Sequence, residues 1–412
     1  MKRFLYGVLS ILFIINLFWK PIKSKAVEQS LKDPIILIHG LAGWGRDELL
    51  GFKYWGGFKD IEANLNQQGY RTFTASVGPF SSNWDRAVEL YAYIKGGTVD
   101  YGAAHAKKHG HARYGRTYPG IYSQWSDDNN LHFVGHSMGG QTERVLVQLL
   151  KEGSREEKDY ATQHPEEGVS SLFEGNKNWV RSVTSIGSPH NGSTFADKEN
   201  MASFLKTFIL KIASLSGSNP ETFVYDFKLD QWGLKRKPGE RFLQYADRML
   251  NSSVWESKDI SAYDLTTAGS KELNQWVKTF DDVYYFSYTG DATYSSLLTG
   301  HALPLLTMNP LMYTSSLHIG KYTRDNQEPF ITKNWWPNDG LVSVISSQYP
   351  HGHPNQAYTG NAKKGVWNYT ATKKNWDHID FIGIDLEDTL GIRNIYSFYN
   401  DIIANLMRIS VN

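Results

Sequence analysis

The chain has 412 residues, a formal net charge of +1 and no cysteine. A near-neutral chain lacks the basic surface that binds nucleic acid, and a chain without cysteine is held by no disulfide. The length is enough to bury a large hydrophobic core, so bound metal ions are the remaining means of adding rigidity.

The first 26 residues have the layout of a signal peptide. A basic start precedes an apolar run over residues 4–19, and small residues at 24 and 26 occupy the positions expected before a cleavage site. The alternative is an uncleaved N-terminal anchor, although the apolar run is short for a membrane span. We therefore expect an exported mature chain, residues 27–412, without a transmembrane anchor.

Predicted strands alternate with predicted helices along this mature chain. Strands are predicted at 34–38, 71–75, 131–134, 180–186 and 283–288, and helices at 61–69, 82–94 and 141–150. The alternation favours an α/β fold with a mostly parallel central sheet. Because no internal repeat or low-complexity linker is present, we expect a single domain with large insertions.

A G-x-S-x-G sequence lies between one predicted strand and its following helix. In Gly135-His136-Ser137-Met138-Gly139 the serine directly follows a short apolar run. This pattern is typical of a sharp turn that exposes a serine nucleophile, and the helix N-terminus favours negative charge developing beside it. The alternative is an ordinary turn with a surface serine.

A serine nucleophile needs a histidine base and a carboxylate that orients the histidine. In this type of fold the carboxylate and then the histidine follow the serine along the chain. Asp339 lies in a turn before an apolar run, and His378 lies at the start of another. His351 and His353 also follow Asp339, but they lie in a turn-like stretch. We predict Asp339 and His378, with the other two histidines as alternatives to His378.

Two backbone N–H groups are expected to bind the oxyanion of the reaction. Met138 directly follows the predicted nucleophile and supplies one of them. Leu41, in the loop after the first strand, is the candidate for the other. The neighbouring His39 is expected to shape this loop rather than to transfer protons.

An amphipathic helix is predicted after the strand at 180–186. From Phe195 to Leu215, apolar residues recur at spacings of three and four. The helix could simply pack on the core. Alternatively, it could belong to a lid, at about 193–235, that covers an apolar cleft in water and opens at a lipid surface.

Two groups of residues are candidate metal ligands. His105, His109 and His111 are spaced like zinc ligands, although the lysines between them also fit a solvated loop. Asp380 and Asp385 flank an apolar run and could hold calcium together with backbone carbonyls. They could equally be ordinary acids at the ends of a strand.

Longer blocks make the chain similar to the exported lipases of staphylococci and of thermophilic bacilli such as Geobacillus. The resemblance extends from about residue 34 to the C-terminus and includes 39–48, 81–87, 99–102, 115–120, 135–141, 225–233 and 338–340. Leu41 and Met138 stand where the thermophilic branch has Phe and Gln, so the staphylococcal branch is closer. These two changes bear on acyl-chain fit, because backbone amides form the oxyanion site.

The resemblance implies an α/β-hydrolase fold and a secreted triacylglycerol lipase. Its triad would be Ser137, Asp339 and His378, with the amides of Leu41 and Met138 as oxyanion donors. General carboxylesterase or phospholipase activity on the same fold is an alternative. So are a zinc hydrolase built on the His105 cluster and a non-catalytic lipid-binding surface protein.

The resemblance also implies two structural metal ions. Zinc would be held by Asp85, His105, His111 and Asp259, in an insertion formed by about 85–120 and 255–265, and His109 would not be a ligand. Calcium would be held by Asp380, Asp385, the Leu386 carbonyl and a backbone carbonyl near Thr307. Leu386 replaces a proline of the family. Because this calcium site would tether the loop of His378, loss of calcium is expected to loosen the general base.

Overall fold

The structure is a computed structural model that describes residues 32–197, 207, 225–384 and 393–410. The predicted signal peptide and most of the helix predicted in the lid region lie outside these residues. None of the helices in the described part is long and apolar enough to cross a membrane.

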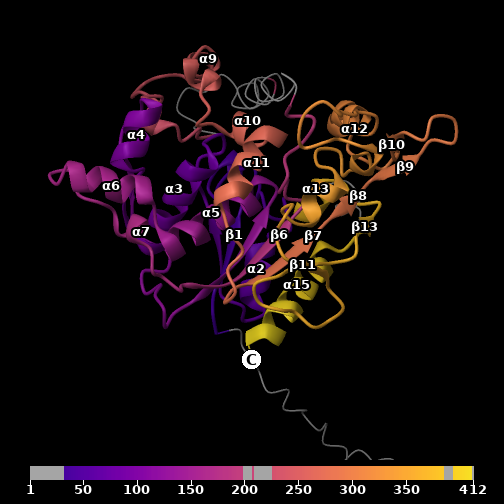
Figure 1. Cartoon of the computed structure of the whole chain (residues 1–412), viewed down its shortest axis with the longest axis horizontal. Coiled ribbons are helices and arrows are strands. Elements are labelled where there is room, and N and C mark those ends of the chain that lie inside the picture. Colours follow the sequence, from indigo (N-terminus) through magenta and orange to yellow (C-terminus); the bar gives the residue numbers. More distant parts are fainter. Residues whose placement is uncertain (1–31, 198–206, 208–224, 385–392, 411–412) are drawn as a thin grey trace, which may run out of the picture.

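A seven-stranded sheet forms the centre of the molecule (Figure 1). Its order is β11-β12-β7-β6-β5-β1-β2, and every neighbouring pair is parallel. The strands are β1 (Ile35–Ile38), β2 (Thr72–Ala75), β5 (Leu131–His136), β6 (Val180–Ile186), β7 (Tyr284–Tyr288), β11 (Asn355–Ala357) and β12 (Trp367–Tyr369). The predicted α/β fold with a mostly parallel sheet is therefore confirmed.

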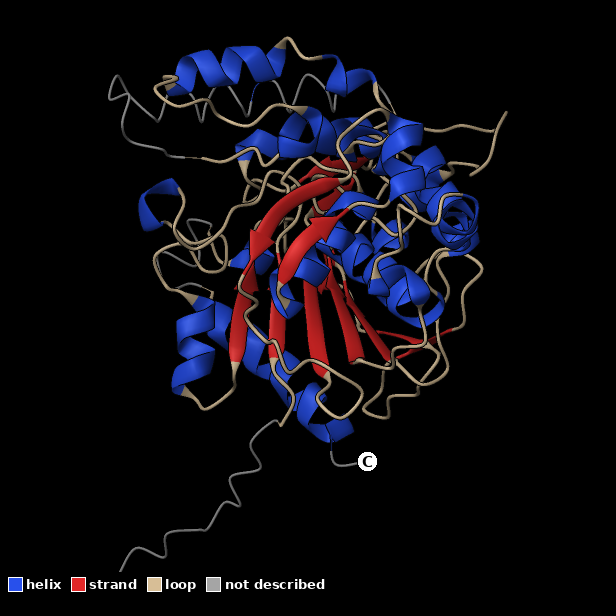
Figure 2. Cartoon of the chain, turned by 90° about the vertical axis from the view of Figure 1, so that its left-hand side faces the viewer, coloured by secondary structure: helices blue, strands red, loops and turns tan. Residues whose placement is uncertain are grey.

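Helices cover both faces of this sheet (Figure 2). They are α2 (Ile61–Gln67), α3 (Asn83–Lys95), α4 (Ala103–His109), α5 (Met138–Glu152), α6 (Arg155–Gln163), α7 (Ser171–Glu174), α9 (Phe242–Leu250), α10 (Ser261–Asp264), α11 (Thr267–Trp276), α12 (Tyr313–Ile319), α13 (Val344–Gln348) and α15 (Ile395–Ser410). The helices predicted at 61–69, 82–94 and 141–150 correspond to α2, α3 and α5.

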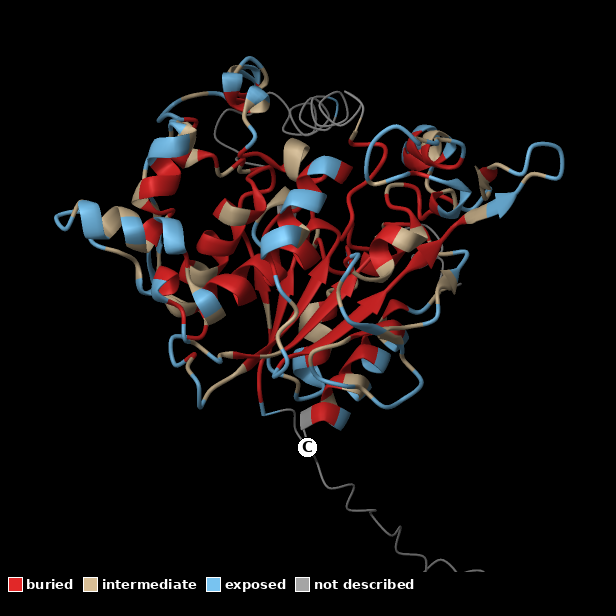
Figure 3. Cartoon of the chain, in the orientation of Figure 1, coloured by how far each residue is buried: buried red, intermediate tan, exposed pale blue. Residues whose placement is uncertain are grey.

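The two faces of the sheet carry separate hydrophobic clusters because successive side chains of a strand point to opposite sides. Ile35 and Leu37 of β1 pack in one cluster with residues of α2 and α15. Ile36 and Ile38 pack in the other with residues of α3, α5 and α11. Every residue of β1 is consequently buried, as are the central strands in general (Figure 3).

Within the described residues, three two-stranded sheets lie outside the central sheet. They are β3 (Gly97–Asp100) with β4 (Tyr114–Tyr118), β9 (Thr293–Ser295) with β10 (Ala302–Pro304), and β8 (Gly290–Asp291) with β13 (Lys373–Lys374). The first two are antiparallel and the third is parallel.

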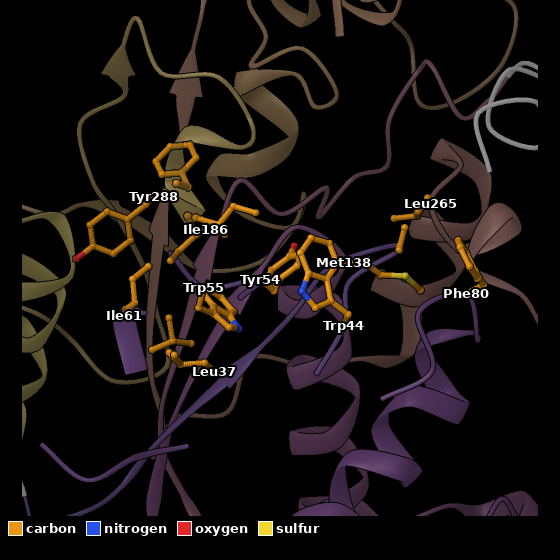
Figure 4. Close-up of a cluster of buried hydrophobic side chains, with 14 of the residues drawn as sticks. Leu37, Trp44, Tyr54, Trp55, Ile61, Phe80, Met138, Ile186, Leu265 and Tyr288 are labelled. Atoms are coloured by element: carbon orange, nitrogen blue, oxygen red, sulfur yellow. The ribbon is translucent and has the colours of Figure 1, made fainter. Parts of the chain in front are cut away.

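The cluster on the α2 and α15 face continues past the end of β1 to the edge where the strands finish (Figure 4). There Trp44 packs edge-on against Tyr54 with ring centroids 5.2 Å apart. Met138, at the start of α5, belongs to the same cluster and is fully buried. In parallel sheets, binding sites form outside the carboxyl ends of the strands, so this edge is where a site is expected.

Candidate active site and metal centre

Ser137 lies at the turn between β5 and α5 in a backbone conformation that non-glycine residues rarely adopt, with φ 56° and ψ −128°. Glycine is required at positions 135 and 139, because other backbone atoms come too close there to leave room for a side chain. A Cβ atom on Gly135 would lie 2.5 Å from the Gly139 carbonyl carbon, and one on Gly139 would lie 2.2 Å from the Ile38 oxygen. The chain can therefore turn sharply and place a serine at the carboxyl edge of the sheet.

Asp339 and His378 form a buried pair at the same edge. His378 Nδ1 and Asp339 Oδ2 are 2.8 Å apart, and both residues are almost fully buried. The other oxygen, Asp339 Oδ1, accepts hydrogen bonds from the N–H groups of Leu341 and Val342 at 3.0 and 2.7 Å. These bonds fix the carboxylate, which can hold the imidazole with its proton on Nδ1 and leave Nε2 to act as a base.

The Ser137 turn and the Asp339–His378 pair both lie against the end of β6. The Ser137 N–H donates to the Ile186 carbonyl at 2.8 Å, and the next residue, Gly187, lies against the pair. A Cβ atom on Gly187 would be 3.3 Å from Asp339 Oδ2 and 3.5 Å from His378 Nδ1. The structure thus places all three predicted triad residues at one edge.

The alternative bases lie elsewhere. His353 Nδ1 is 2.7 Å from the Thr279 hydroxyl, and His351 is exposed on the same turn. His353 hydrogen-bonds to the Thr279 hydroxyl and the Asn274 carbonyl, whereas His378 hydrogen-bonds to Asp339.

The loop after β1 lies directly against the nucleophile, since a Cβ atom on Gly40 would be 2.6 Å from Ser137 Cβ. The His39 carbonyl accepts from the Arg86 guanidinium at 2.5 Å. His39 Nδ1 donates to the Gly40 carbonyl at 2.9 Å, and Nε2 accepts from the Val77 N–H at 3.3 Å. Burial lowers the pKa of His39 well below its usual value, so the ring is neutral and shapes the loop.

This loop carries Leu41, and Met138 lies across from it as the first residue of α5. An N–H in the first turn of a helix has no acceptor within that helix, so the Met138 N–H can serve a ligand. Arg86 and the His39 ring hold the backbone that directly precedes Leu41.

A second cluster of polar residues lies away from this edge. Asp85 of α3, His105 of α4, His111 and Asp259 each offer a ligand atom, and the four atoms lie within 4.8 Å of one another. These atoms, Asp85 Oδ1, His105 Nε2, His111 Nε2 and Asp259 Oδ2, are buried and have no hydrogen-bond partner. Four buried ligand atoms that converge on one another could bind a metal ion.

The spacing of the ligand atoms supports this interpretation. His105 Nε2 is 3.3 Å from both carboxylate oxygens, while His111 Nε2 is 3.2 Å from Asp259 Oδ2 and 4.0 Å from Asp85 Oδ1. A tetrahedral ion bound at 2.0–2.1 Å separates its ligands by about 3.3 Å. Burial disfavours the charged form of His105, but the Asp259 and Asp85 carboxylates raise its pKa to about 9.

His109 is not part of this cluster, although its ring lies 4.5 Å from that of His105. Both histidines line a surface hollow of about 510 Å³ that also reaches Asp259. Two members of the cluster, His105 and Asp259, therefore border an opening to solvent.

The residues predicted for calcium are only partly described. Asp385 and Leu386 lie outside the described residues, whereas Asp380 begins a short helical turn and is buried. Its carboxylate pairs with Arg393 and accepts from the Asp377 N–H at 2.6 Å. Thr307 and Arg393 line the same surface hollow.

Three residues with clear structural roles at the site were not singled out from the sequence. Arg86 holds the loop after β1, and Tyr54 and His136 hydrogen-bond to each other beneath it at 2.6 Å. His136 was visible only as the variable position of the G-x-S-x-G sequence. Tyr54 belongs to no catalytic motif in the sequence.

The parallel sheet, the nucleophile turn after β5 and the helices on both faces define an α/β-hydrolase fold. The family model described as "Lipase-like, C-terminal domain" matches residues 31–411. The chain therefore belongs to this family.

Individual relatives agree with the predicted resemblance to the staphylococcal branch. The chain is 44% identical to Lipase 1 of Staphylococcus aureus over 395 residues, which are 93% of this chain and 56% of that protein. It thus spans a little over half the length of the curated relatives it matches.

Two solved structures extend the comparison. EstA from Clostridium botulinum is 47% identical, with a TM-score of 0.85 over 92% of this chain and 88% of that chain. Staphylococcus hyicus lipase is 40% identical, with a TM-score of 0.79 over 92% and 96%.

Proposed function

We propose that this chain is a secreted triacylglycerol lipase that hydrolyses carboxylic esters through an acyl-enzyme. The observation that carries the proposal is the Asp339–His378 pair, with its 2.8 Å hydrogen bond, beside the strained Ser137 turn. Membership of a lipase-like family and similarity to named staphylococcal lipases support the substrate class.

In the first half of the reaction, the Ser137 hydroxyl oxygen attacks the ester carbonyl carbon while His378 Nε2 takes the hydroxyl proton. The Leu41 and Met138 N–H groups stabilise the resulting oxyanion, and Asp339 stabilises the imidazolium. Collapse of the tetrahedral intermediate expels the alcohol, which receives the proton from His378.

In the second half, His378 takes a proton from water, and the water oxygen attacks the acyl carbon. The second tetrahedral intermediate uses the same two N–H donors. Its collapse releases the fatty acid and returns the proton to Ser137.

We propose that zinc is the ion of the Asp85, His105, His111 and Asp259 cluster. Two imidazole nitrogens and two carboxylate oxygens at tetrahedral spacing are suitable zinc ligands. When bound, zinc closes this site structurally and supplies no reaction step. Its four ligands tie α3 and α4 to the segment before α10.

Calcium remains a proposal at Asp380, Asp385, the Leu386 carbonyl and Thr307. Asp380 is a suitable hard oxygen ligand, but Arg393 contacts the same carboxylate. Calcium binding there requires Arg393 to withdraw. Isothermal titration with calcium tests this, because Asp380→Asn should abolish calcium binding and Arg393→Gln should strengthen it.

The lid proposed at about 193–235 would cover the apolar part of the active-site edge. Interfacial activation is its expected signature, namely a rise in the rate when a soluble ester passes its solubility limit.

The deciding experiment compares the mature protein with Ser137→Ala on emulsified long-chain triglyceride and on a soluble short-chain ester. We expect the variant to lose both activities while keeping its far-ultraviolet circular dichroism and metal content. The parent's ratio of the two rates distinguishes a lipase from a general carboxylesterase. A variant that retains the parental rate would mean that Ser137 is not the nucleophile, and the metal cluster would become the candidate catalytic site.

A further inference from the structure

The β9–β10 hairpin and the turns after it carry apolar side chains that are almost fully exposed. Leu297 and Leu298, in the loop between the two strands, are 103% and 97% exposed, and Leu306, after β10, is 95% exposed. Tyr294 and Leu311 are more than half exposed as well. Scattered exposed leucines are ordinary, but so many in one segment mark an interaction surface. We call these five residues the hairpin surface.

The segment that carries the hairpin surface has no charged side chain. Charged residues make up 21% of the chain, yet the stretch 292–320 contains no Asp, Glu, Lys or Arg. Solubility normally favours charges at exposed loop tips. The exposed residues of this stretch therefore form an uncharged surface that is suited to an environment other than water.

The hairpin holds its leucines outward instead of folding them inward. The Ser296 N–H donates to the His301 carbonyl and the Gly300 N–H to the Ser296 carbonyl, both at 2.8 Å. The Ser296 hydroxyl accepts from the Leu298 N–H at 3.3 Å. Because the loop satisfies its own backbone groups, its tip is a preformed apolar projection (Figures 1 and 3).

The base of the hairpin is joined to the active-site edge. It leaves the sheet through β7 and β8, and the Ala292 N–H donates to the Asn338 carbonyl at 3.0 Å. Asn338 directly precedes Asp339 of the proposed triad. A surface that binds the hairpin tip is therefore held near the active-site edge, where substrate must arrive.

We propose that the hairpin surface inserts into a lipid layer and anchors the active-site edge to it. The proposal rests on the function above, because a water-insoluble ester must be met at its surface. The tip presents two exposed leucines, whereas a stable dimer needs on the order of 1,200 Å² of buried surface. Since the segment is uncharged, insertion is driven by apolar burial and is independent of anionic lipid and of salt.

The test measures sedimentation with phosphatidylcholine vesicles, using Ser137→Ala as the background so that no lipid is hydrolysed. The double variant Leu297→Ser/Leu298→Ser should partition at least about tenfold more weakly than its background. Leu306→Ser alone should have a smaller effect in the same direction. The matched control is Tyr114→Ser, which removes an exposed ring at the start of β4 and should partition normally. β4 follows α4, and α4 lies on the opposite side of the molecule from the hairpin (Figure 1).

Partition that is equal in the double variant and the background would overturn the proposal, as would binding that requires anionic lipid or disappears in salt. Concentration-dependent self-association that the double variant abolishes would also overturn it in favour of a second copy of the chain. With Ser137 restored, the double variant should hydrolyse soluble short-chain ester at the parental rate. A parent that hydrolyses no ester would refute the proposed function while leaving vesicle partition measurable.

Tyr54 and His136 connect the loop after β1 to the backbone of His378 through hydrogen bonds. The Gly40 N–H donates to Tyr54 Oη at 3.0 Å, Tyr54 Oη lies 2.6 Å from His136 Nδ1, and His136 Nε2 lies 2.9 Å from the His378 carbonyl. An amide can only donate and a carbonyl can only accept. Tyr54 must therefore donate to Nδ1, and His136 must carry its proton on Nε2. Burial lowers the pKa of His136, which keeps this ring neutral.

We infer that Tyr54 and His136 are positioning residues. They fix the loop after β1, which carries Leu41, relative to the loop that carries His378. One end of their chain of hydrogen bonds is the residue before Leu41, and the other is the backbone of His378 itself. Tyr54 lies among Trp44 and Met138 in the buried cluster, so water cannot replace its hydroxyl (Figure 4). The inference again rests on the proposed function.

The test is steady-state hydrolysis of a soluble ester. Tyr54→Phe and His136→Leu should each lower kcat about tenfold or more with little change in KM, because transition-state contacts are misplaced. His136→Gln should restore most of kcat, since its amide can accept from Tyr54 and donate to the His378 carbonyl. His132→Leu is the control, because it removes another buried histidine of β5, bonded to Ser182 at 2.7 Å.

A parental kcat in Tyr54→Phe would overturn the inference, and so would an equal loss of kcat in His132→Leu. Failure of His136→Gln to recover more activity than His136→Leu would do so as well. An inactive parent enzyme would count against the proposed function instead.

Discussion

At the scale of single residues, the site depends on groups whose possible partners are limited by burial. Asp339 is fully buried, and its Oδ1 is already committed to two backbone N–H groups. Only Oδ2 remains for His378. The side chain therefore determines which imidazole tautomer the site holds.

Asp339→Asn should accordingly reduce kcat by about 10⁴-fold while leaving the fold intact. The two backbone donors require an oxygen at Oδ1, so the new amide nitrogen must face His378 and favours the tautomer that cannot accept the serine proton. Soluble-ester kinetics with a circular dichroism check measures this. His353→Ala is the comparison and should keep the parental rate; a large loss there would return that histidine to the candidates for the base.

Also at the scale of single residues, the buried Glu89 carboxyl group should make the stability of the fold depend on pH. It accepts from the Gly78 N–H at 2.5 Å and from the Tyr101 hydroxyl at 2.8 Å, and burial raises its pKa to about 7. The folded state therefore holds this proton more tightly than the unfolded state, and the associated stability is lost as the pH rises from about 4.5 to about 7.

Glu89→Gln is neutral throughout this range and should escape the loss. The variant's free energy of unfolding, relative to the parent, should rise by up to about 3 kcal/mol between pH 4.5 and pH 7. Urea unfolding at several pH values, with metal content held constant, measures the difference. A difference that does not change with pH would mean that Glu89 titrates alike in both states.

At the scale of elements, strands with apolar runs were predictable, and two polar strands were missed. β1 and β5 were found because parallel strands covered on both faces contain mainly apolar residues, and β6 was found although only three of its seven residues are apolar. β11 and β12 were missed. In β12 the buried Asn368 is satisfied by a hydrogen bond to the Tyr285 carbonyl at 2.9 Å, which no periodicity reveals.

The candidate site was predictable to a similar extent. The nucleophile turn is a local pattern, so Ser137 and Met138 could be named from their neighbours. Asp85 and Asp259 come from distant segments and were named only through family resemblance. Tyr54 was missed because its role depends on how two loops meet in three dimensions.

At this scale, an ion bound by the metal cluster should stabilise the elements that the cluster joins. Removing the ion should lower Tm, because four buried polar atoms are left without partners and two carboxylates approach each other. His105→Ala should lower metal content and Tm together, whereas His109→Ala should change neither. Elemental analysis and thermal unfolding measure both quantities. Loss of metal from His109→Ala would assign that histidine to the site.

At the scale of the whole molecule, the two hydrophobic clusters share one sheet, so neither face can unfold alone. We therefore predict that residues 27–412 unfold as a single domain, in one calorimetric transition when metal is bound. Ile402→Ala, which empties a fully packed position of α15, should lower the stability of this one transition by about 2–5 kcal/mol. Two transitions, only one of which shifts, would indicate separate domains.

The positions of the metal ligands along the chain have a consequence for how this protein becomes stable. Asp85 and Asp259 lie on either side of the Ser137 turn and of the predicted lid, so an ion that joins them closes a very long loop. Closing such a loop restricts the unfolded chain as a disulfide does, and the restriction grows with loop length. With an ion bound at this cluster, a chain with no cysteine would gain a cross-link that needs no oxidant. Its strength is set by the concentration of free metal rather than by the redox state of its surroundings.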